Sequence, residues 1–242
     1  MRRSPNFRDI NWSWHNQHHA REFFTILLQS MIRRDVLVAQ ILQGIFGFEM
    51  ITKSPCLNCG VLDAFHDPIQ YSLCLALPQQ AVPTPTTLNR LVCNGTDGHF
   101  DHINSTRHCP ACHQGAANNI QFTRFATAPE ILVLELERFT RVNGAWRKNS
   151  SPVSFTQDLD LSPFISHTAT LKYRLIAVIH QRGSLTFGRY KVVTKTPGGK
   201  WEEIHDRAVS KVRVGAALTP AAPWMPFMLV YTRVDGQVSV RR

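Results

Sequence analysis

Two short cysteine pairs constrain this chain more than any other feature. They read CLNC and CPAC, and their cysteines are Cys56, Cys59, Cys109 and Cys112. Each pair can offer two thiolates to one metal ion with little backbone strain, and four thiolates complete a tetrahedral Zn²⁺ site. Zinc is favoured over an iron–sulfur cluster because the site is symmetric and no further cysteine triplet surrounds it. The long spacer, residues 60–108, predicts that the site joins the ends of two hairpins.

Other side chains near these pairs leave alternatives open. Histidines close to the second pair could replace one thiolate, although four thiolates already fill the coordination shell. These histidines are His99, His102, His108 and His113. The remaining cysteines, Cys74 and Cys93, lie in apolar segments and are expected to be buried small hydrophobes.

The composition is that of a folded protein inside the cell. Of the 242 residues, 43% are hydrophobic and 18% are charged. No run approaches the roughly 20 apolar residues that a membrane span needs. The N-terminus MRRSPNFRDI has cations but no apolar stretch behind them, so it does not resemble a secretory signal. We expect an intracellular location, in the cytoplasm or the nucleus, where cysteines seldom form disulfides.

The charge balance raises the hypothesis of an anionic partner. The chain has 27 basic and 17 acidic residues, which gives a formal net charge of +10. Such an excess is compatible with nucleic-acid binding. The cations, however, are scattered as short pairs and are not interleaved with aromatic residues, which argues against a nucleic-acid groove.

The order of predicted elements favours an α+β fold. Apolar residues at helical spacing predict a helix over Gln17–Arg33, with Asn16 as its N-cap, and a shorter helix over 36–42. Thr84 and Pro85 predict the start of another short helix. Strand patterns dominate the rest and indicate a long antiparallel sheet. They cover residues 45–54, 69–77, 120–127, 130–139, 171–181, 187–195, 200–205 and 226–234.

Several segments together resemble a known family. They read QHHAREFF, ILQGIFGFEMITKSPCLNCG, HCPAC, APEILVLELERF, YRLIAVI, GSLTFGRY, KWEEIHDRAV and PFMLVYTRV. In this order they are similar to the ubiquitin-specific proteases, papain-like cysteine peptidases that remove ubiquitin from proteins. The similarity covers nearly all of residues 16–235.

The resemblance implies a papain-like α+β fold with a partial helical thumb, an antiparallel β palm and zinc-tipped β fingers. Residues 16–44 would form the thumb, 45–128 mostly the fingers, and 129–235 the palm. Residues 1–15 would be a flexible segment and 236–242 a basic tail. The four paired cysteines would hold one structural zinc. Ubiquitin or a ubiquitin-like protein would lie against fingers and palm, with Gly188, Tyr190 and Trp201 as candidate contacts.

The departures from the family pattern concern its catalytic residues. The family's nucleophile precedes the segment matching QHHAREFF, and the residues before Gln17 contain no cysteine. The family's general base is the histidine of a Gly-His-Tyr triplet, and here that position is Arg189. The orienting residue corresponds to His205, and Asp206 matches the acidic residue that follows it. An arginine remains protonated at neutral pH and has no lone pair, so it cannot act as the base.

Other groups in the chain could replace this chemistry only poorly. His180 and His205 are candidate bases, and Cys74 and Cys93 are candidate nucleophiles. Neighbouring residues of a regular strand point to opposite faces, so His205 and Asp206 are not expected to face one atom. In the family's fold the two cysteines would lie far from the palm.

Three hypotheses follow from the sequence. The first is a catalytically inactive domain of this family that works by binding ubiquitin. The second is a truncated or decaying copy of an active thiol-dependent deubiquitinase. The third is a basic zinc module that binds nucleic acid.

Overall fold

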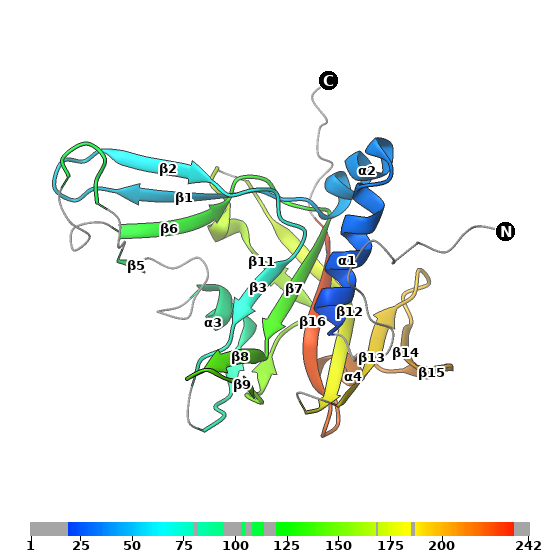
Figure 1. Cartoon of the computed structure of the whole chain (residues 1–242). Helices are drawn as coiled ribbons and strands as arrows, with labels where there is room; N and C mark the ends of the chain where they lie inside the picture. Colours follow the sequence, from blue (N-terminus) through cyan, green and yellow to red (C-terminus); the bar gives the residue numbers. More distant parts are fainter. Residues whose placement is uncertain are drawn as a thin grey trace.

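Two sheets of different size and a pair of helices organise the chain (Figure 1). The structure is a computed structural model and describes residues 19–79, 82–93, 103–104, 108–113, 120–167, 169–184 and 187–234. The predicted segment 1–15, the predicted cap Asn16 and the predicted tail 236–242 lie outside the described residues.

The larger, eight-stranded sheet contains most of the strands that follow Ile131. In spatial order it consists of β15 (Ala208–Val212), β14 (Trp201–His205), β13 (Gly188–Lys195), β12 (Lys172–Gly183), β16 (Met225–Arg233), β7 (Ile131–Glu137) and β3 (Leu73–Ala76), with β11 (Asp158–Asp160) paired to β12. The pairs are antiparallel as predicted, except that β3 runs parallel to β7. Strand β7, between β16 and the edge strand β3, is almost entirely buried, because its run of apolar residues is covered on both faces.

The smaller, four-stranded sheet extends away from the larger one (Figure 1). Its strands are β2 (Leu62–His66), β1 (Met50–Pro55), β6 (Ile120–Phe125) and β5 (Ile103–Asn104). The strand predicted over 45–54 begins only at Met50, because Ile45 and Phe46 belong to the preceding helix.

Two helices cover one side of the larger sheet. The first, α1 (Ala20–Ile32), is shorter at its start than predicted, and the second, α2 (Val36–Phe46), extends beyond the predicted 36–42. The Asp35 carboxylate caps α2, since it accepts hydrogen bonds from the N–H groups of Leu37 at 2.7 Å and Val38 at 3.4 Å.

The short helix predicted from Thr84 starts one turn later. It is α3 (Leu88–Cys93), and Thr87 rather than Thr84 accepts the capping hydrogen bond, from the Arg90 N–H at 3.1 Å. The remaining short elements are β4 (Thr86–Thr87), β8 (Phe139–Val142), β9 (Ala145–Lys148), β10 (Val153–Ser154), the 3₁₀ turn η4 (Ser162–Phe164) and α4 (Gly215–Leu218). Among the described residues, no helix has the length and hydrophobicity that crossing a bilayer requires.

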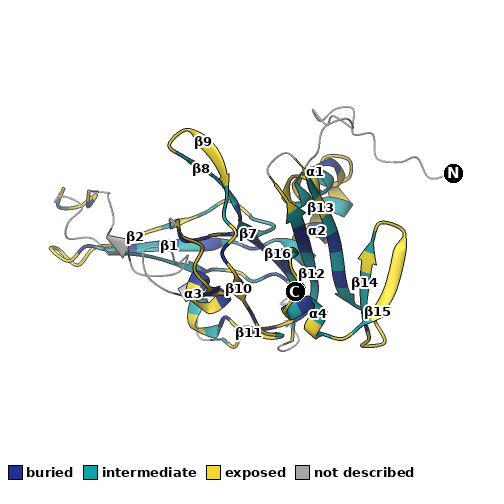
Figure 2. Ribbon diagram, turned by 90° about the horizontal axis from the view of Figure 1, so that it is seen from below, coloured by how far each residue is buried: buried dark blue, intermediate teal, exposed yellow. Residues whose placement is uncertain are grey.

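A single large core joins the two sheets. Phe48, Met50 and Phe125 at the base of the smaller sheet pack in the same buried cluster as Leu134 of β7 and Leu229 of β16. Figure 2 shows the buried strands of the larger sheet, whereas β15 and the hairpin β8–β9 are mostly exposed.

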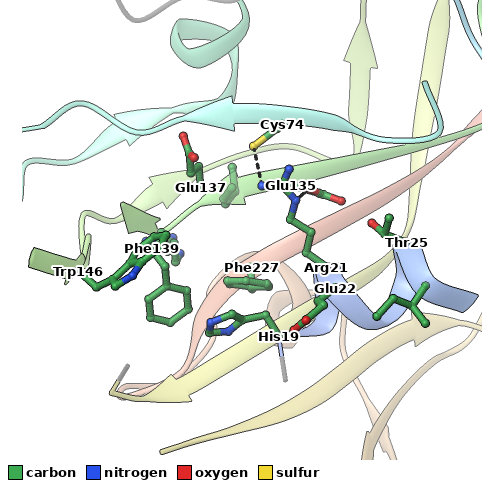
Figure 3. A pocket seen from close by; sticks show the side chains of 13 residues that line it. His19, Arg21, Glu22, Thr25, Cys74, Glu135, Glu137, Phe139, Trp146 and Phe227 are labelled. Atoms are coloured by element: carbon green, nitrogen blue, oxygen red, sulfur yellow. Dashed lines mark hydrogen bonds and ion pairs between the residues drawn. The ribbon is translucent and has the colours of Figure 1, made fainter. Parts of the chain in front are cut away.

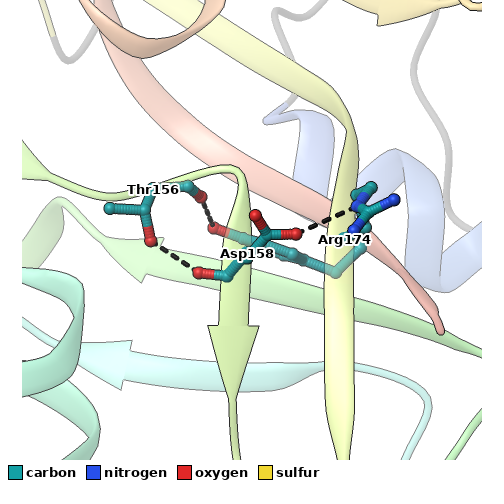
Figure 4. A network of polar contacts seen from close by, with 4 residues as sticks. Thr156, Asp158 and Arg174 are labelled. Carbon is teal, nitrogen blue, oxygen red and sulfur yellow. Dashed lines mark hydrogen bonds and ion pairs between the residues drawn. The ribbon is translucent and has the colours of Figure 1, made fainter. Parts of the chain in front are cut away.

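Polar contacts hold β11 against the centre of this sheet (Figure 4). The Arg174 guanidinium lies 2.9 Å from the Asp158 carboxylate, and the Thr156 hydroxyl donates to the Asp158 carbonyl at 2.6 Å. The buried Tyr231 hydroxyl donates to the Thr156 carbonyl at 2.9 Å. The bond to Thr156 satisfies the buried Tyr231 hydroxyl, which would otherwise be costly to bury, whereas the Arg174–Asp158 pair is exposed.

Candidate functional site

Arg189 lies at the start of β13, directly after a tight connection from β12. Gly183, at the end of β12, has a φ of +104° and approaches Phe187 so closely that a Cβ would lie 2.2 Å from the Phe187 carbonyl oxygen. Only glycine fits there. The turn therefore brings Arg189 directly opposite Arg182 of β12.

The structure brings the three positions that were predicted as degenerate catalytic residues together. One Arg189 guanidinium nitrogen lies 3.5 Å from a carboxylate oxygen of Asp206, and His205 Nε2 lies 3.9 Å from the same oxygen. The expectation that His205 and Asp206 would not face one atom assumed a regular strand, and this assumption does not hold at Asp206. Asp206 follows β14 in a turn with a φ of +54°, so the alternation of a regular strand does not apply to it.

Arg189 and Asp206 form an ion pair, and the arginine in this pair cannot act as a general base. The Arg189 and Asp206 side chains are 64% and 72% exposed, so water screens their attraction and the pair contributes little to stability. His205 packs edge-on against Trp224, with ring centroids 5.3 Å apart, and its Nε2 is buried without a hydrogen bond among the described residues. A guanidinium that remains protonated cannot take a proton from a nucleophile.

His180, a candidate replacement base, is buried in the core. Its side chain is 0% exposed, and Nε2 lies 3.1 Å from the Ala217 carbonyl oxygen. Burial lowers the pKa of His180 to about 4. Such a histidine is a weak base at neutral pH, and its position excludes substrate.

Cys74 lies in the larger sheet, which corrects the expectation that it is far from the palm. It belongs to β3, directly opposite Glu135 of β7, and it is only half-buried. Its Sγ lies 3.5 Å from an Arg21 guanidinium nitrogen. Burial nevertheless raises the pKa of the Cys74 thiol to about 11, so the thiol is protonated at neutral pH. The side chain of Cys93 lies outside the described residues.

Cys74 lines a cavity of about 740 Å³ between α1 and the larger sheet (Figure 3). Its walls combine apolar rings with acidic groups: His19, Glu22, Cys74, Glu135, Glu137, Phe139, Trp146 and Phe227. Sequence reasoning missed this cavity. The signal was the pair of glutamates in the otherwise apolar stretch ILVLELE, because charged residues are seldom placed in a buried strand without a partner.

Contacts between α1 and the sheet shape this cavity. The His19 ring stacks on Phe139 at 4.5 Å between centroids, and its Nδ1 lies 3.3 Å from the Tyr190 hydroxyl. The Arg21 Nε lies 2.8 Å from a carboxylate oxygen of Glu135. Glu135 is 2% exposed, and burial raises the pKa of its carboxyl group.

The four paired cysteines meet at the far end of the smaller sheet. Their sulfur atoms all lie within 4.8 Å of one another, and the pairs Cys56–Cys112 and Cys59–Cys109 have S···S distances of 3.6 Å. These distances exclude disulfides. Sulfurs bound about 2.3 Å from one tetrahedral zinc would lie about 3.8 Å apart, so the donor set and its spacing fit such an ion.

Backbone hydrogen bonds shape both cysteine turns. The N–H of Gly60 donates to the Cys56 carbonyl and the N–H of His113 donates to the Cys109 carbonyl, each at 2.9 Å. These turns place both sulfurs of a pair on one side. Neither described histidine near the second pair, His108 or His113, joins the cysteine cluster, and His99 and His102 lie outside the described residues.

Comparison with known sequences assigns the family. The profile of the family described as "Ubiquitin carboxyl-terminal hydrolase" matches residues 3–231. The chain belongs to the ubiquitin-specific protease family. The human ubiquitin carboxyl-terminal hydrolase 17-like protein 11 is 29% identical over 190 residues, which are 75% of this chain and 33% of that protein. The human 17-like protein 6 is 28% identical over 190 residues, 75% of this chain and 44% of that protein. The chain thus spans less than half the length of these relatives.

Solved structures share the fold of this ubiquitin-specific protease family member. A chain in the SAGA DUB module of Ubp8, Sgf11, Sus1 and Sgf73 bound to monoubiquitin has a TM-score of 0.77 and 22% identity, with 92% of this chain and 50% of that chain covered. The same module bound to ubiquitin aldehyde gives a TM-score of 0.76 and 20% identity, with the same coverage. At this level of identity the likeness concerns the fold.

The division into thumb, fingers and palm stays a prediction of the family resemblance. On that prediction the four-stranded sheet with the cysteine cluster corresponds to the fingers, the eight-stranded sheet to the palm, and α1 and α2 to the thumb. Between residues 45 and 128, β3 is part of the palm sheet.

The three candidate ubiquitin contacts have different environments. Gly188 is partly buried at the start of β13, beside the exposed Arg189. Tyr190 is partly buried against Phe227, with ring centroids 5.6 Å apart. Trp201 is 8% exposed and belongs to the main core, so its visible role is packing. Direct contact with ubiquitin remains a prediction for all three.

Proposed function

We propose that this ubiquitin-specific protease-like chain is catalytically inactive and binds ubiquitin. The observation that carries the inactivity is the ion pair of Arg189 with Asp206 at the family's base position. Loss of the base from a nucleophile–base unit removes about 10⁴- to 10⁶-fold of rate.

The described thiols offer no alternative route. Four of them form the metal-type cluster at the fingertips, and Cys74 is held protonated by burial. Cys74 and Arg189 also belong to different cavities, since Cys74 lines the cavity under α1 and Arg189 lines one at the β12–β13 turn. A thiolate and a base that do not meet cannot cooperate in acyl transfer.

Support for ubiquitin binding comes from the retained fold and from the surface of the fingers. Matching folds have been solved with monoubiquitin bound. Leu57, Val61 and Leu62 near the cysteine cluster are exposed, and Leu62 is 53% accessible. Exposed apolar groups that gather at one place are typical of an interaction surface.

Activity is tested with a fluorogenic substrate that carries a ubiquitin C-terminus. We expect that the chain at micromolar concentration hydrolyses the substrate over hours no faster than buffer alone does. Turnover that is abolished by thiol alkylation would show that the chain is an enzyme and would overturn the inactive assignment.

Binding is tested by isothermal titration of the zinc-loaded chain with ubiquitin. We expect a saturable isotherm that persists at moderate salt. A Leu62→Asp variant should weaken binding about tenfold, since a charge at an apolar contact is costly to desolvate. Val209→Asp is the matched control, because Val209 is similarly exposed on the edge strand β15. The absence of saturable binding would overturn this part of the proposal.

A further inference from the structure

A second cavity, at the β12–β13 turn, collects positive charge. It has a volume of about 540 Å³, and three cations line it: Lys148 from β9, Arg182 from β12 and Arg189 from β13. Ser150 adds a hydroxyl group, and Phe187 and Met225 add apolar surface. None of the described residues that line the cavity is acidic.

The two arginines face each other across the strand pair. Arg182 and Arg189 are direct partners in the antiparallel register, so their side chains leave the sheet on the same face. Like charges directly opposite each other are unfavourable in a sheet. The Arg182 guanidinium is also held in place, because it lies 4.7 Å from the centre of the Trp224 ring. A bound anion between the two guanidinium groups would offset their repulsion.

Lys148 brings a third positive charge to the same place. Its ammonium group donates to the Gln181 side-chain oxygen and to the Gly183 carbonyl, both at 2.6 Å. Burial, together with the nearby Arg138, lowers the pKa of Lys148, which shows that its environment is already unfavourable for a cation. Three elements thus hold three cations around one cavity.

We propose that this cavity binds a phosphate monoester group. Arginine forks match the oxygens of phosphate, and a phosphate carries about −1.5 to −2 charges at pH 7, which suits three cations better than a single carboxylate. The phosphate can come from a phosphorylated side chain or from a small free phosphate compound. The cavity includes Gly188, one of the candidate ubiquitin contacts, so its test uses small probes on the chain alone, without ubiquitin.

Asp206 gives the proposal a specific consequence. Its carboxylate lies 3.5 Å from Arg189 and competes with a bound anion for that guanidinium. Removing this carboxylate with Asp206→Asn should therefore tighten phosphate binding two- to threefold, whereas loss of an unrelated surface charge has no such effect.

The experiment is a calorimetric titration of the zinc-loaded chain with inorganic phosphate, pyrophosphate and a phosphoserine peptide. We expect saturable binding, weakened at least tenfold by Arg182→Gln or Arg189→Gln. Arg147→Gln is the matched control, because Arg147 is the exposed neighbour of Lys148 on β9 and points to the other face of the hairpin. It should change affinity less than twofold. Thermal melts check that each variant is folded.

The results distinguish the two sources of phosphate from each other and from the absence of a specific site. Tight binding of the phosphoserine peptide, but not of its unphosphorylated form or of inorganic phosphate, identifies a protein side chain as the source; equal binding of pyrophosphate identifies a small phosphate. No saturable binding of any of the three probes overturns the proposal. Equal losses in Arg182→Gln and Arg147→Gln, or binding only of an oligonucleotide, would also overturn it, since both indicate a diffuse basic surface.

Discussion

At the scale of single residues, the start of β13 keeps the glycine and tyrosine of the family's triplet around a side chain with different chemistry. Gly188 pairs with Gly183 at the end of the tight turn, and Tyr190 packs inward on Phe227, so both have structural roles. Arg189 between them is exposed and paired with Asp206. These contacts support the proposal that the framework of the site persists without the group that would accept a proton.

Restoring the histidine alone should not restore catalysis. In an Arg189→His variant the imidazole would regain a lone pair, but the described thiols lie in the metal-type cluster or, for Cys74, in another cavity. We expect ubiquitin substrate hydrolysis to remain at the buffer rate. A rate that rises with Arg189→His and disappears on alkylation would contradict this prediction.

His180 should make stability depend on pH. Its folded pKa is about 4 against an ordinary 6.5, while Lys191 and Glu203 lie close enough to influence it with opposite signs. Above pH 6.5 the imidazole is neutral in both states. As the pH falls from 6.5 to 4 the unfolded chain takes up a proton that the folded chain does not, so the free energy of unfolding drops by up to about 1.4 kcal/mol per pH unit. Urea melts between pH 4 and 8 measure this slope.

Two variants isolate the contribution of His180 to that slope. His180→Gln should flatten it, because the amide can still donate to the Ala217 carbonyl but does not titrate. His167→Gln, at an exposed histidine, is the matched control. Equal slopes in all three proteins would refute the assignment.

At the scale of elements, polar contacts decide how the hairpin β8–β9 is joined to the sheet. Arg138, between β7 and β8, is 0% exposed. Its guanidinium donates to the carbonyl groups of Pro226 at 2.6 Å, Ser151 at 2.9 Å and Asn149 at 3.1 Å. Burial lowers the pKa of Arg138 to about 10, and the group remains a cation at neutral pH.

Replacing this arginine should destabilise the fold strongly. Arg138→Met leaves three carbonyls without their donor, and we expect a loss of about 3 kcal/mol or more in the free energy of unfolding. Arg141→Met is the control on the same hairpin, because Arg141 is exposed and, within the described part of the chain, its guanidinium bonds to the Gly144 carbonyl of its own turn alone. Its effect should stay below about 1 kcal/mol. Urea denaturation compares the two.

The cysteine cluster at the fingertip predicts that the stability of the fold depends on a bound metal ion. We propose that the four sulfurs hold one structural Zn²⁺, and elemental analysis of protein purified without added metal should give about one zinc per chain. Cys109→Ser should abolish this content, whereas Cys74→Ser should not, since Cys74 lies outside the cluster. A chain that contains no zinc and melts identically with chelator would rule out the structural ion.

At the scale of the whole molecule, fingers and palm share one core at their base but differ at the far end. Phe48, Met50 and Phe125 pack with the palm strands, whereas β2 alternates exposed and half-buried residues and none of them is buried. A chelator should therefore open the fingertips without unfolding the palm. Hydrogen exchange should show faster exchange in β2 and around the cysteine turns, while β12 and β16 remain protected. Simultaneous loss of protection in both sheets would instead indicate one cooperative unit.

Much of the fold could be predicted because it depends on local patterns. The apolar runs from Ile131 onward predicted most strands of the large sheet, and the family resemblance predicted the α+β fold. The boundaries were less accurate. Thr84 was chosen as a cap instead of Thr87, and Ile45 was assigned to a strand, since short apolar runs do not distinguish a helix end from a strand.

The sequence by itself determined the four metal-type thiols and the family, because residue identity at a fixed spacing carries both, and it predicts that Arg189 stands in place of the base. Only the tertiary structure decided which side chains meet. Strand register places Arg182 opposite Arg189, a turn with positive φ carries Asp206 to Arg189, and the parallel pairing of β3 with β7 brings Cys74 into the palm. These contacts join residues far apart in the chain. No local pattern specifies them, because register and turn geometry arise only when the sheet is packed.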